Sequence, residues 1–243
     1  MTEPIIAPSA HVDPSTHIGD KVSIGVGAIV ASSPETPTVL MDGCSIGVGV
    51  IITAGVTVGR GARVEAGSVV SVDVPSKAVL RGNPGVIIGY VDALPRGRND
   101  KPASSNKVEL GVDGCALWPL VRITDLRGAL TPIEFEGDLP FVPRRQFFVS
   151  DVANAEVRGE HAHRECDQFL IAVRGSLSVV IDDGVNSTEI RLDHPNLGLF
   201  LPAGIWGVQY KFSADGILAV YASLPYDNDD YIRSYEDFLA FRG

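Results

Sequence analysis

The sequence predicts an all-β protein of two domains, a triangular parallel β-helix followed by an antiparallel β-barrel with a short C-terminal helix. Three observations lead to this fold class. Aliphatic residues recur every six positions between residues 6 and 70, short alternating runs follow from residue 115 onward, and only residues 228–243 have a helical pattern. Each of these segments is justified below in chain order.

The repeat comes first. A period of six fits neither an amphipathic helix nor a simple alternating strand. It fits a coil of triangular cross-section, in which each side takes six residues, the aliphatic residue points inward and a glycine or small residue permits the corner. One interval, from Val30 to Leu40, is ten residues long and predicts a protruding loop. The aliphatic positions are Ile6, Val12, Ile18, Ile24, Val30, Leu40, Ile46, Ile52, Val58, Val64 and Val70.

The repeat stops at the turn "GNPG", and the following stretch is rich in Pro, Gly, Ser and charge. We therefore expect domains at 1–92 and 113–243, joined by a linker at 93–112. In the second domain, runs such as "RRQFFVSDV", "QFLIAVRG" and "ILAVYASL" alternate and are separated by turn residues, as a compact antiparallel barrel requires. We expect Asp229 or Asp230 to cap the terminal helix.

Composition excludes several functions. The chain of 243 residues has a net charge of -10 and a pI near 4.9, which disfavours binding to nucleic acid or to an anionic membrane. It has no uninterrupted apolar run long enough to cross a bilayer and no basic-then-apolar leader, so we expect a cytoplasmic protein. The three cysteines are far apart and predict free thiols.

The stretch "RGEHAHRECDQFLIAVRG" contains two histidines, His161 and His163, that a strand would place on one face. Three interpretations are open: a metal site, an acid/base pair, or satisfied core residues. The spacing to Gln168 and the later "LPAGIWG" resemble the two cupin motifs, in which histidines and a glutamate bind a metal. Here the glutamate is replaced by Gln168 and the last histidine by Gly207, a poor ligand set, so we expect no metal. Acid/base catalysis is the favoured interpretation, because histidine titrates near neutral pH.

Two resemblances to known families follow from these motifs. The hexads and the tail "VSVDVPSKAVLRGNPGVIIGYV" resemble the left-handed parallel β-helix of the hexapeptide acyltransferases. The segments "DLRGALTPIE", "RRQFFV", "LPAGIW" and "YDNDDYIRSYEDFL", together with the histidine strand, resemble the cupin-type (RmlC-like) 3,4-ketoisomerases that act on dTDP-4-keto-6-deoxy-D-glucose. The whole chain is similar to the bifunctional ketoisomerase/N-acetyltransferases.

The resemblance implies catalysis by His161 and His163, without deciding which is the base. It implies substrate contacts from the following residues: Arg127, Glu134, Arg145, Arg158, Gln168 and Trp206, with the arginines suited to the diphosphate. For Trp206 a place in the core is the alternative. Phe147, Phe148 and Gly207 depart from the family pattern and leave both configurations of the product at C4 open.

The implied function is a 3,4-ketoisomerase that needs no cofactor, with a β-helix that mainly builds the oligomer. The alternative is a bifunctional enzyme that also uses acetyl-CoA to N-acetylate a dTDP-3-amino-3,6-dideoxy sugar. A non-catalytic sugar-nucleotide binding protein is a third possibility. The resemblance also implies a homo-oligomer, a trimer through the β-helix and a dimer through the cupin, combining as a hexamer.

Overall fold

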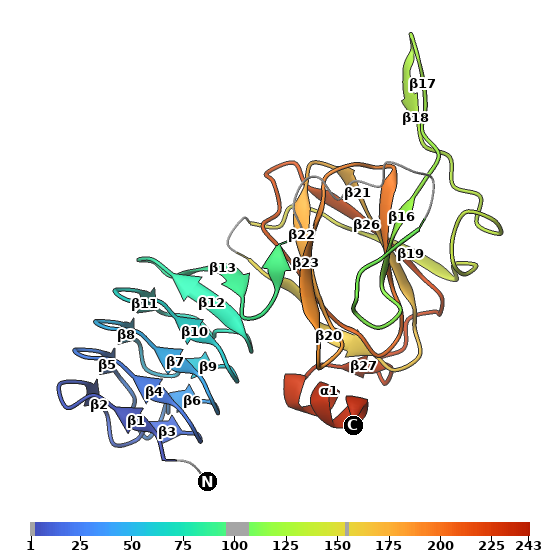
Figure 1. The fold of residues 1–243 in the computed structure, drawn as a ribbon. Helices are drawn as coiled ribbons and strands as arrows, with labels where there is room; N and C mark the ends of the chain where they lie inside the picture. The colour runs from blue at the N-terminus through green and yellow to red at the C-terminus, as the bar shows by residue number, and fades with distance from the viewer. Residues whose placement is uncertain (1–2, 96–106, 154–155) are drawn as a thin grey trace. The chain divides into compact units, whose positions relative to one another are not determined.

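The computed structural model describes residues 3–95, 107–153 and 156–243, which form twenty-seven strands and one helix. The chain divides into two compact units, Met1–Val91 and Asp92–Gly243. The all-β prediction is confirmed for the described residues (Figure 1). Most of the expected linker, residues 96–106, lies outside the described residues, and the two strands that flank it pair with strands of the second unit.

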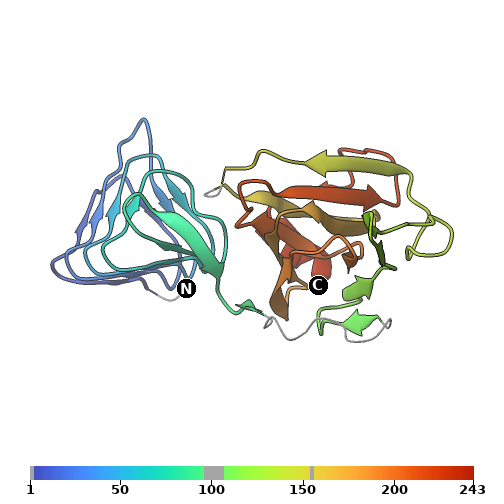
Figure 2. The ribbon, with the colours of Figure 1, turned by 90° about the horizontal axis from the view of Figure 1, so that it is seen from above.

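The first unit is a β-solenoid in which each hexad contributes one two-residue strand. From Ile24 onward, the second residue of each such strand is buried, as the period of six predicts. Viewed along its axis, the unit has a triangular cross-section (Figure 2). Its strands are β1 (Ile5–Ile6), β2 (His11–Val12), β3 (His17–Ile18), β4 (Ser23–Ile24), β5 (Ile29–Val30), β6 (Val39–Leu40), β7 (Ser45–Ile46), β8 (Ile51–Ile52), β9 (Thr57–Val58), β10 (Arg63–Val64), β11 (Val69–Val70), β12 (Ala78–Arg81) and β13 (Val86–Tyr90).

Three parallel sheets form the sides of the triangle. Their orders are β1-β4-β7-β10-β12, β2-β5-β8-β11 and β3-β6-β9, and β13 closes the first sheet as an antiparallel hairpin with β12. Glycine is needed at the corners because successive turns lie close together. A Cβ on Gly47, for example, would lie 2.7 Å from the backbone nitrogen of Ala66 in the next turn.

The second unit is a barrel built from two six-stranded sheets. The first has the order β14-β23-β22-β25-β20-β27, and the second has the order β15-β16-β24-β21-β26-β19. The strands are β14 (Leu94–Pro95), β15 (Val108–Glu109), β16 (Ala116–Pro119), β17 (Ile123–Asp125), β18 (Gly128–Leu130), β19 (Arg145–Val149), β20 (Arg158–His163), β21 (Gln168–Arg174), β22 (Leu177–Asp182), β23 (Ser187–Leu192), β24 (Leu197–Leu201), β25 (Trp206–Tyr210), β26 (Ile217–Ala222) and β27 (Tyr231–Ile232).

The helix α1 (Tyr235–Arg242) begins later than expected. Its N-cap is Ser234, whose hydroxyl accepts a hydrogen bond from the backbone N–H of Asp237, so the expected cap at Asp229 or Asp230 is wrong. The helix docks through Tyr235, whose hydroxyl donates to the buried carboxylate of Asp182 at 2.9 Å. No helix within residues 3–95, 107–153 and 156–243 has the length and hydrophobicity that a membrane span requires.

Candidate active site

The two histidines lie at the end of β20. The first part of this strand pairs with β25, and its last two residues pair with β27. His161 is opposite Gly207 of β25, and His163 is opposite Tyr231 of β27. Their ring centroids are 5.0 Å apart, with planes at 82°. The prediction that both rings share one face is therefore confirmed.

A β-bulge precedes the pair and shifts by one residue the alternation of side chains between the two faces of the strand. Gly159 and Glu160 both have positive φ, at 84° and 53°, and the register shifts between Gly159 and His161. A Cβ on Gly159 would lie 2.6 Å from the carbonyl oxygen of Gly207, so only glycine fits there. Because of the shift, Arg158 and His161 emerge on the same face although they are three residues apart.

The tautomer and the neutral charge of His161 allow it to act as a base. Its Nδ1 lies 2.8 Å from the carbonyl oxygen of Gly159, which can only accept, so Nδ1 carries the hydrogen. Nε2 is then an unprotonated acceptor, without a partner among the described residues. Burial lowers the pKa of His161 to about 4, so the ring is neutral at pH 7.

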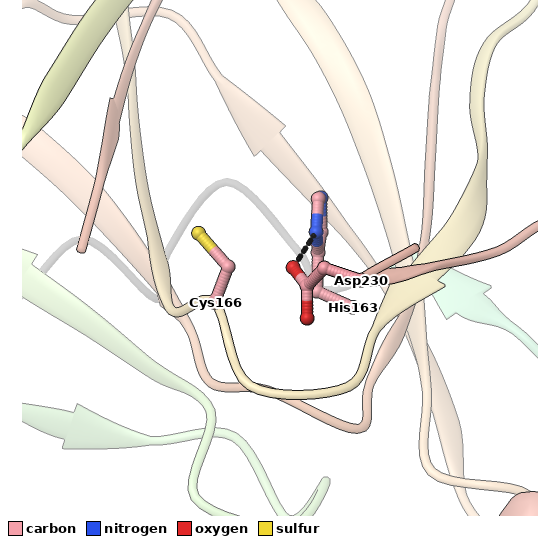
Figure 3. A group of neighbouring side chains, drawn as sticks. All are labelled: His163, Cys166 and Asp230. Carbon is pink, nitrogen blue, oxygen red and sulfur yellow. Dashed lines mark hydrogen bonds and ion pairs between the residues drawn. The ribbon is translucent and has the colours of Figure 1, made fainter. Parts of the chain in front are cut away.

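His163 is held at both nitrogens. Its Nδ1 lies 2.7 Å from Oδ2 of Asp230 (Figure 3), and its Nε2 lies 3.0 Å from the amide nitrogen of Gln168. Burial alone would raise the pKa of Asp230, but hydrogen bonds from the N–H of Glu165 and from His163 outweigh it and lower this pKa. The ionised carboxylate accepts a hydrogen bond from Nδ1–H of His163, so Nε2 is unprotonated and accepts the hydrogen bond that Gln168 donates.

The electrostatics of His163 combine opposing effects. Burial lowers its pKa most, the hydrogen bond to Asp230 opposes this, and the positive charges of Arg145 and Arg233 lower the pKa further. At pH 7 the ring is therefore neutral in the free protein. A proton that arrives on Nε2 would be stabilised by the carboxylate on the opposite side of the ring.

Tyr231 covers both imidazoles, with ring centroids 4.9 Å from His161 and 4.3 Å from His163. The space between the two histidines, Gln168 and the facing strands measures about 10 Å³, enough for little more than one water molecule. The other lining residues are Cys166, Leu201, Pro202, Ile205, Gly207 and Gln209.

One group of side chains has the ligand types of a metal site: His163, Cys166 and Asp230 lie within 4.8 Å of one another. The histidine and the aspartate, however, are already joined by a hydrogen bond of 2.7 Å and are almost fully buried. A metal bound by both would have to displace that proton, and Gln168 supplies a neutral amide where metal-binding cupins have a carboxylate. These side chains are therefore better suited to sharing a proton than to binding a metal ion.

The structure brings two of the expected substrate residues to this pocket. Gln168 bonds directly to His163. Arg145 is in register with Ala222, which is in register with Gln168, so all three side chains emerge on the same face of their sheet. Arg158 is opposite Gln209, a pocket residue, and is exposed at the start of β20.

Three others lie elsewhere. Arg127 is at the tip of the β17–β18 hairpin, where its exposed side chain pairs with Asp125. Glu134 is exposed in the loop that follows the hairpin. Trp206 is buried beneath α1, against Tyr235 and Phe238 at 5.3 and 5.6 Å, so it occupies the core position that the sequence analysis gave as the alternative.

The two phenylalanines that depart from the family pattern lie on opposite faces of β19. Phe147 packs against the barrel core, whereas Phe148 is 61% exposed. Only Phe147 therefore stands where a tyrosine hydroxyl would point into the barrel. Gly207 lines the pocket opposite His161, and a Cβ there would lie 3.1 Å from Cδ2 of Leu201.

Sequence reasoning missed Asp230, Tyr231 and Arg233. All three belong to the segment "NDDYIRSYEDF", for which the sequence predicts a helix because an aspartate can cap it and its apolar residues recur on one helical face. The available signal was the resemblance of "YDNDDYIRSYEDFL" to the 3,4-ketoisomerases, which marks the segment but assigns no role to these three residues. Nothing in their spacing indicates a partner nearly seventy residues earlier in the chain.

Comparison with known proteins separates the two units. The family model described as "FdtA: WxcM-like, C-terminal" matches residues 113–243. The TDP-4-oxo-6-deoxy-alpha-D-glucose-3,4-oxoisomerase of Aneurinibacillus thermoaerophilus is 40% identical over 120 residues, which cover 49% of this chain and 86% of that protein. The crystal structure of a 3,4-ketoisomerase from Helicobacter canadensis is 35% identical with a TM-score of 0.52, covering 54% of this chain and 98% of that one.

The solenoid has different relatives. The 2,3,4,5-tetrahydropyridine-2,6-dicarboxylate N-acetyltransferase of Clostridium perfringens is 40% identical over 83 residues. The match covers 32% of this chain and 35% of that protein. This chain thus spans about a third of the length of that acetyltransferase. The similarity confirms the expected resemblance of the first unit to acyltransferases.

Proposed function

Because the chain belongs to the FdtA family through its WxcM-like C-terminal domain, we propose that it is a 3,4-ketoisomerase. Its substrate is dTDP-4-keto-6-deoxy-D-glucose, and its product is the 3-keto isomer. The reaction moves one hydrogen from C3 to C4 and one from the C3 oxygen to the C4 oxygen. Oxidation at C3 and reduction at C4 balance within the sugar, so the isomerisation needs no redox cofactor.

His161 is the residue that transfers the proton between the two carbons. Its free Nε2 takes the C3 hydrogen, which is acidified by the neighbouring carbonyl, and the electron pair forms the enediolate between C3 and C4. The same nitrogen returns the proton to C4. The bond from Nδ1 to the carbonyl of Gly159 fixes the tautomer and the ring orientation throughout.

His163 transfers the proton between the two oxygens. Its Nε2 exchanges the hydrogen bond from Gln168 for the hydroxyl at C3, takes that proton as C3 becomes a ketone, and delivers it to the C4 oxygen. Asp230 holds the Nδ1 hydrogen and stabilises the transient imidazolium. Both protons then end on the product, and both imidazoles return to their starting state.

One observation supports this proposal most directly: of two neighbouring imidazoles, His161 has an Nε2 without a partner among the described residues, whereas His163 is bonded at Nδ1 to a carboxylate and at Nε2 to an amide. The test is to incubate the protein with dTDP-4-keto-6-deoxy-D-glucose and follow the sugar ring by NMR. We expect conversion by the wild type, and a loss of about 10²- to 10⁴-fold in His161→Asn. Equal behaviour of the wild type and His161→Asn, with both folded by circular dichroism, would overturn the proposal.

A second activity, N-acetylation of a dTDP-3-amino-3,6-dideoxy sugar with acetyl-CoA, is favoured by the similarity of the solenoid to an N-acetyltransferase. The histidines of this unit, His11 and His17, are both exposed on its first strands, so a base further along the solenoid would have to come from another residue. Mixing the protein with acetyl-CoA and the amino sugar and measuring thiol release tests this activity. No release and no CoA binding would leave the solenoid as a scaffold.

The proposal includes a homo-oligomer formed through both units. On the solenoid, the outward face of the β2-β5-β8-β11 sheet is apolar: Ile29 and Ile51 are 44% and 42% exposed, beside Val26 and Val48 at one corner. This face supports a trimer. On the barrel, the β17–β18 hairpin projects into solvent (Figure 1) and exposes Leu126 at its tip, which supports a dimer.

A trimer through the solenoid combined with a dimer through the barrel would form the hexamer that the family resemblance implies. Light scattering after size-exclusion chromatography tests this assembly. The paired change Ile29→Lys and Ile51→Lys is expected to leave a dimer. A wild-type monomer would contradict the assembly.

A further inference from the structure

A second cavity, which we call the distal cavity, lies at the end of β25 away from the histidines. It measures about 520 Å³, a size typical of small-molecule sites. Gly207, near the start of β25, lines the histidine pocket, whereas Lys211, directly after the strand, lines the distal cavity. Gly207 and the last strand residue, Tyr210, are three residues apart, so about 10 Å of strand separates the two spaces. The distal cavity is therefore a site distinct from the histidine pocket.

Three hydrogen-bond donors reach the distal cavity from neighbouring strands of one sheet. The donors are Arg191 of β23, Ser176 directly before β22 and Lys211 directly after β25. These strands are adjacent in the order β23-β22-β25, and Ser178 is in register with both Arg191 and Tyr210. The pairing therefore brings the three donors to the same end of the sheet.

The hydroxyl of Ser176 is buried, and the chain does not use its hydrogen. Ser176 is 8% exposed, and its oxygen accepts a hydrogen bond from the guanidinium of Arg191 at 2.7 Å. Within residues 3–95, 107–153 and 156–243, no group accepts a hydrogen bond from this hydroxyl. A buried donor without an acceptor is destabilising, so the O–H indicates an acceptor that a bound molecule supplies.

The charged side chains of the distal cavity occupy separate positions. Arg191 bonds to a neutral hydroxyl, and no carboxylate among the described residues forms an ion pair with it. Lys211 pairs with the buried carboxylate of Glu189 at 3.1 Å and keeps further N–H donors. Asp151, which follows β19, lines the same cavity and forms no ion pair with either cation in the described part of the chain. The cavity therefore offers one position for an anionic group and another for hydrogen-bond donors.

The wall between these groups is partly apolar. Val152 and Phe212 line the cavity and belong to the barrel core. Apolar walls with a few polar groups are usual in small-molecule sites, and they accommodate the C–H groups of a sugar ring. Lys211 and Asp151 both have positive φ, at 51° and 57°, a conformation that is uncommon outside glycine and that recurs at functional sites.

We propose that the distal cavity binds a small phosphorylated sugar or polyol. The three terminal oxygens of a phosphate monoester accept hydrogen bonds from Arg191, Ser176 and Lys211, whose cationic groups compensate its charge. The hydroxyl groups of the ligand donate to the carboxylate of Asp151. A carboxylate ligand has only two oxygens for the three donors and matches them less well. The site goes beyond the proposed function, because no step of the isomerisation uses these residues.

The test is calorimetry at pH 7 on the full chain, with D-glucose 1-phosphate as the probe. We expect the wild type to bind it with a Kd below about 1 mM. Arg191→Gln is expected to weaken binding about tenfold or more, because it removes a charge-assisted hydrogen bond, and Ser176→Ala about two- to tenfold. Arg81→Gln is the matched control: Arg81 is exposed on the solenoid, and its loss changes the net charge equally.

Two further probes separate the parts of the ligand. Inorganic phosphate lacks the hydroxyl groups, so we expect it to bind about tenfold more weakly than D-glucose 1-phosphate. D-glucose lacks the charge and is expected not to bind. Equal affinity for inorganic phosphate and D-glucose 1-phosphate would overturn the assignment of a sugar or polyol.

Isomerisation is the second readout. Arg191→Gln is expected to isomerise dTDP-4-keto-6-deoxy-D-glucose as the wild type does, since Arg191 lies at the other end of the sheet from the histidines. The inference fails if this variant, folded by circular dichroism, binds D-glucose 1-phosphate within about twofold of the wild type. It also fails if isomerisation is lost together with binding, because the probe would then occupy the histidine pocket.

The outcome for the wild type separates this inference from the proposed function. A wild type that isomerises the keto sugar but does not bind D-glucose 1-phosphate overturns the inference alone. A wild type that binds the probe, with the expected loss in Arg191→Gln, but does not isomerise the keto sugar contradicts the proposed function alone.

Discussion

Asp230 and His163, 67 positions apart in the sequence, share a hydrogen bond of 2.7 Å in which almost nothing of either side chain is exposed. The same carboxylate accepts the N–H of Glu165 and so anchors the C-terminal segment to the turn after β20. One residue therefore fixes both the tautomer of an imidazole and the position of the segment that covers it.

Replacing Asp230 with Asn removes the acceptor that holds the Nδ1 hydrogen. The amide can present its N–H to Nδ1, which favours the wrong tautomer of His163, and the imidazolium loses its counter-charge. We expect kcat to fall about 10²- to 10⁴-fold with little change in KM. Asp229→Asn is the control, because Asp229 is exposed and makes no contact with either histidine in the described residues. Similar kcat values for the two variants would contradict the role of Asp230.

Replacing Gln168 with Glu places a carboxylate beside Nε2 of His163, where the amide nitrogen is now 3.0 Å away. An opposite charge favours the protonated ring, so the pKa of His163 should rise by about 1–3 units. With both nitrogens protonated, the ring cannot accept the hydroxyl proton at neutral pH, and activity should recover as the pH is raised. NMR titration of His163 and the pH profile of kcat measure this. Gln168→Leu separates loss of the amide from gain of charge, and a pKa that rises equally in both variants would argue against the electrostatic cause.

The acid limb of the pH profile reports on His161. Burial lowers its pKa to about 4, so the basic form persists on acidification well below the ordinary value of 6.5. Burial also lowers the pKa of His163, which must be neutral to accept a proton, so the profile of kcat/KM, which reflects the free enzyme, should fall only below the ordinary histidine value of 6.5. A break near 6.5, with the protein still folded, would show that the base is not the buried His161.

Gly159→Ala tests the bulge before the histidines. The new Cβ would lie 2.6 Å from the carbonyl oxygen of Gly207, at a φ of 84° that alanine rarely adopts. We expect the free energy of unfolding to fall by about 1–3 kcal/mol and the activity to fall with it, since His161 bonds to the Gly159 carbonyl. Gly137→Ala is the control, because its Cβ would meet nothing within 4 Å. Urea denaturation of both variants measures the difference, and equal stability would contradict the steric argument.

Removal of metal ions should leave the isomerisation unchanged. Asp230 and His163 share a proton, and the third donor, the Cys166 thiol, already bonds to the carbonyl oxygen of Asp167. The measurement is activity after dialysis against a chelator, with and without added divalent cation. Activity that is lost on dialysis and restored by one cation would contradict the metal-free mechanism.

Much of the fold could be predicted from the sequence because its determinants are local. Each solenoid strand is specified within its own hexad, by an aliphatic residue that must point inward and a small residue that permits the corner, so the period alone defines the unit. The shared face of His161 and His163 follows in the same way from the alternation of a strand. Gln168 was identified by its spacing within a motif, which is also local.

The tertiary structure alone decided which side chains complete the site. Trp206 and Gly207 are neighbours on β25 but face opposite sides of the strand. Trp206 therefore packs beneath the helix, whereas Gly207 lines the pocket. Asp230 fits a helix cap in sequence, but the pairing of β27 with β20 brings it to His163. Hydrophobic periodicity specifies which face of an element is buried, whereas the contacts between polar groups depend on how distant strands pair, and no short stretch of sequence encodes that pairing.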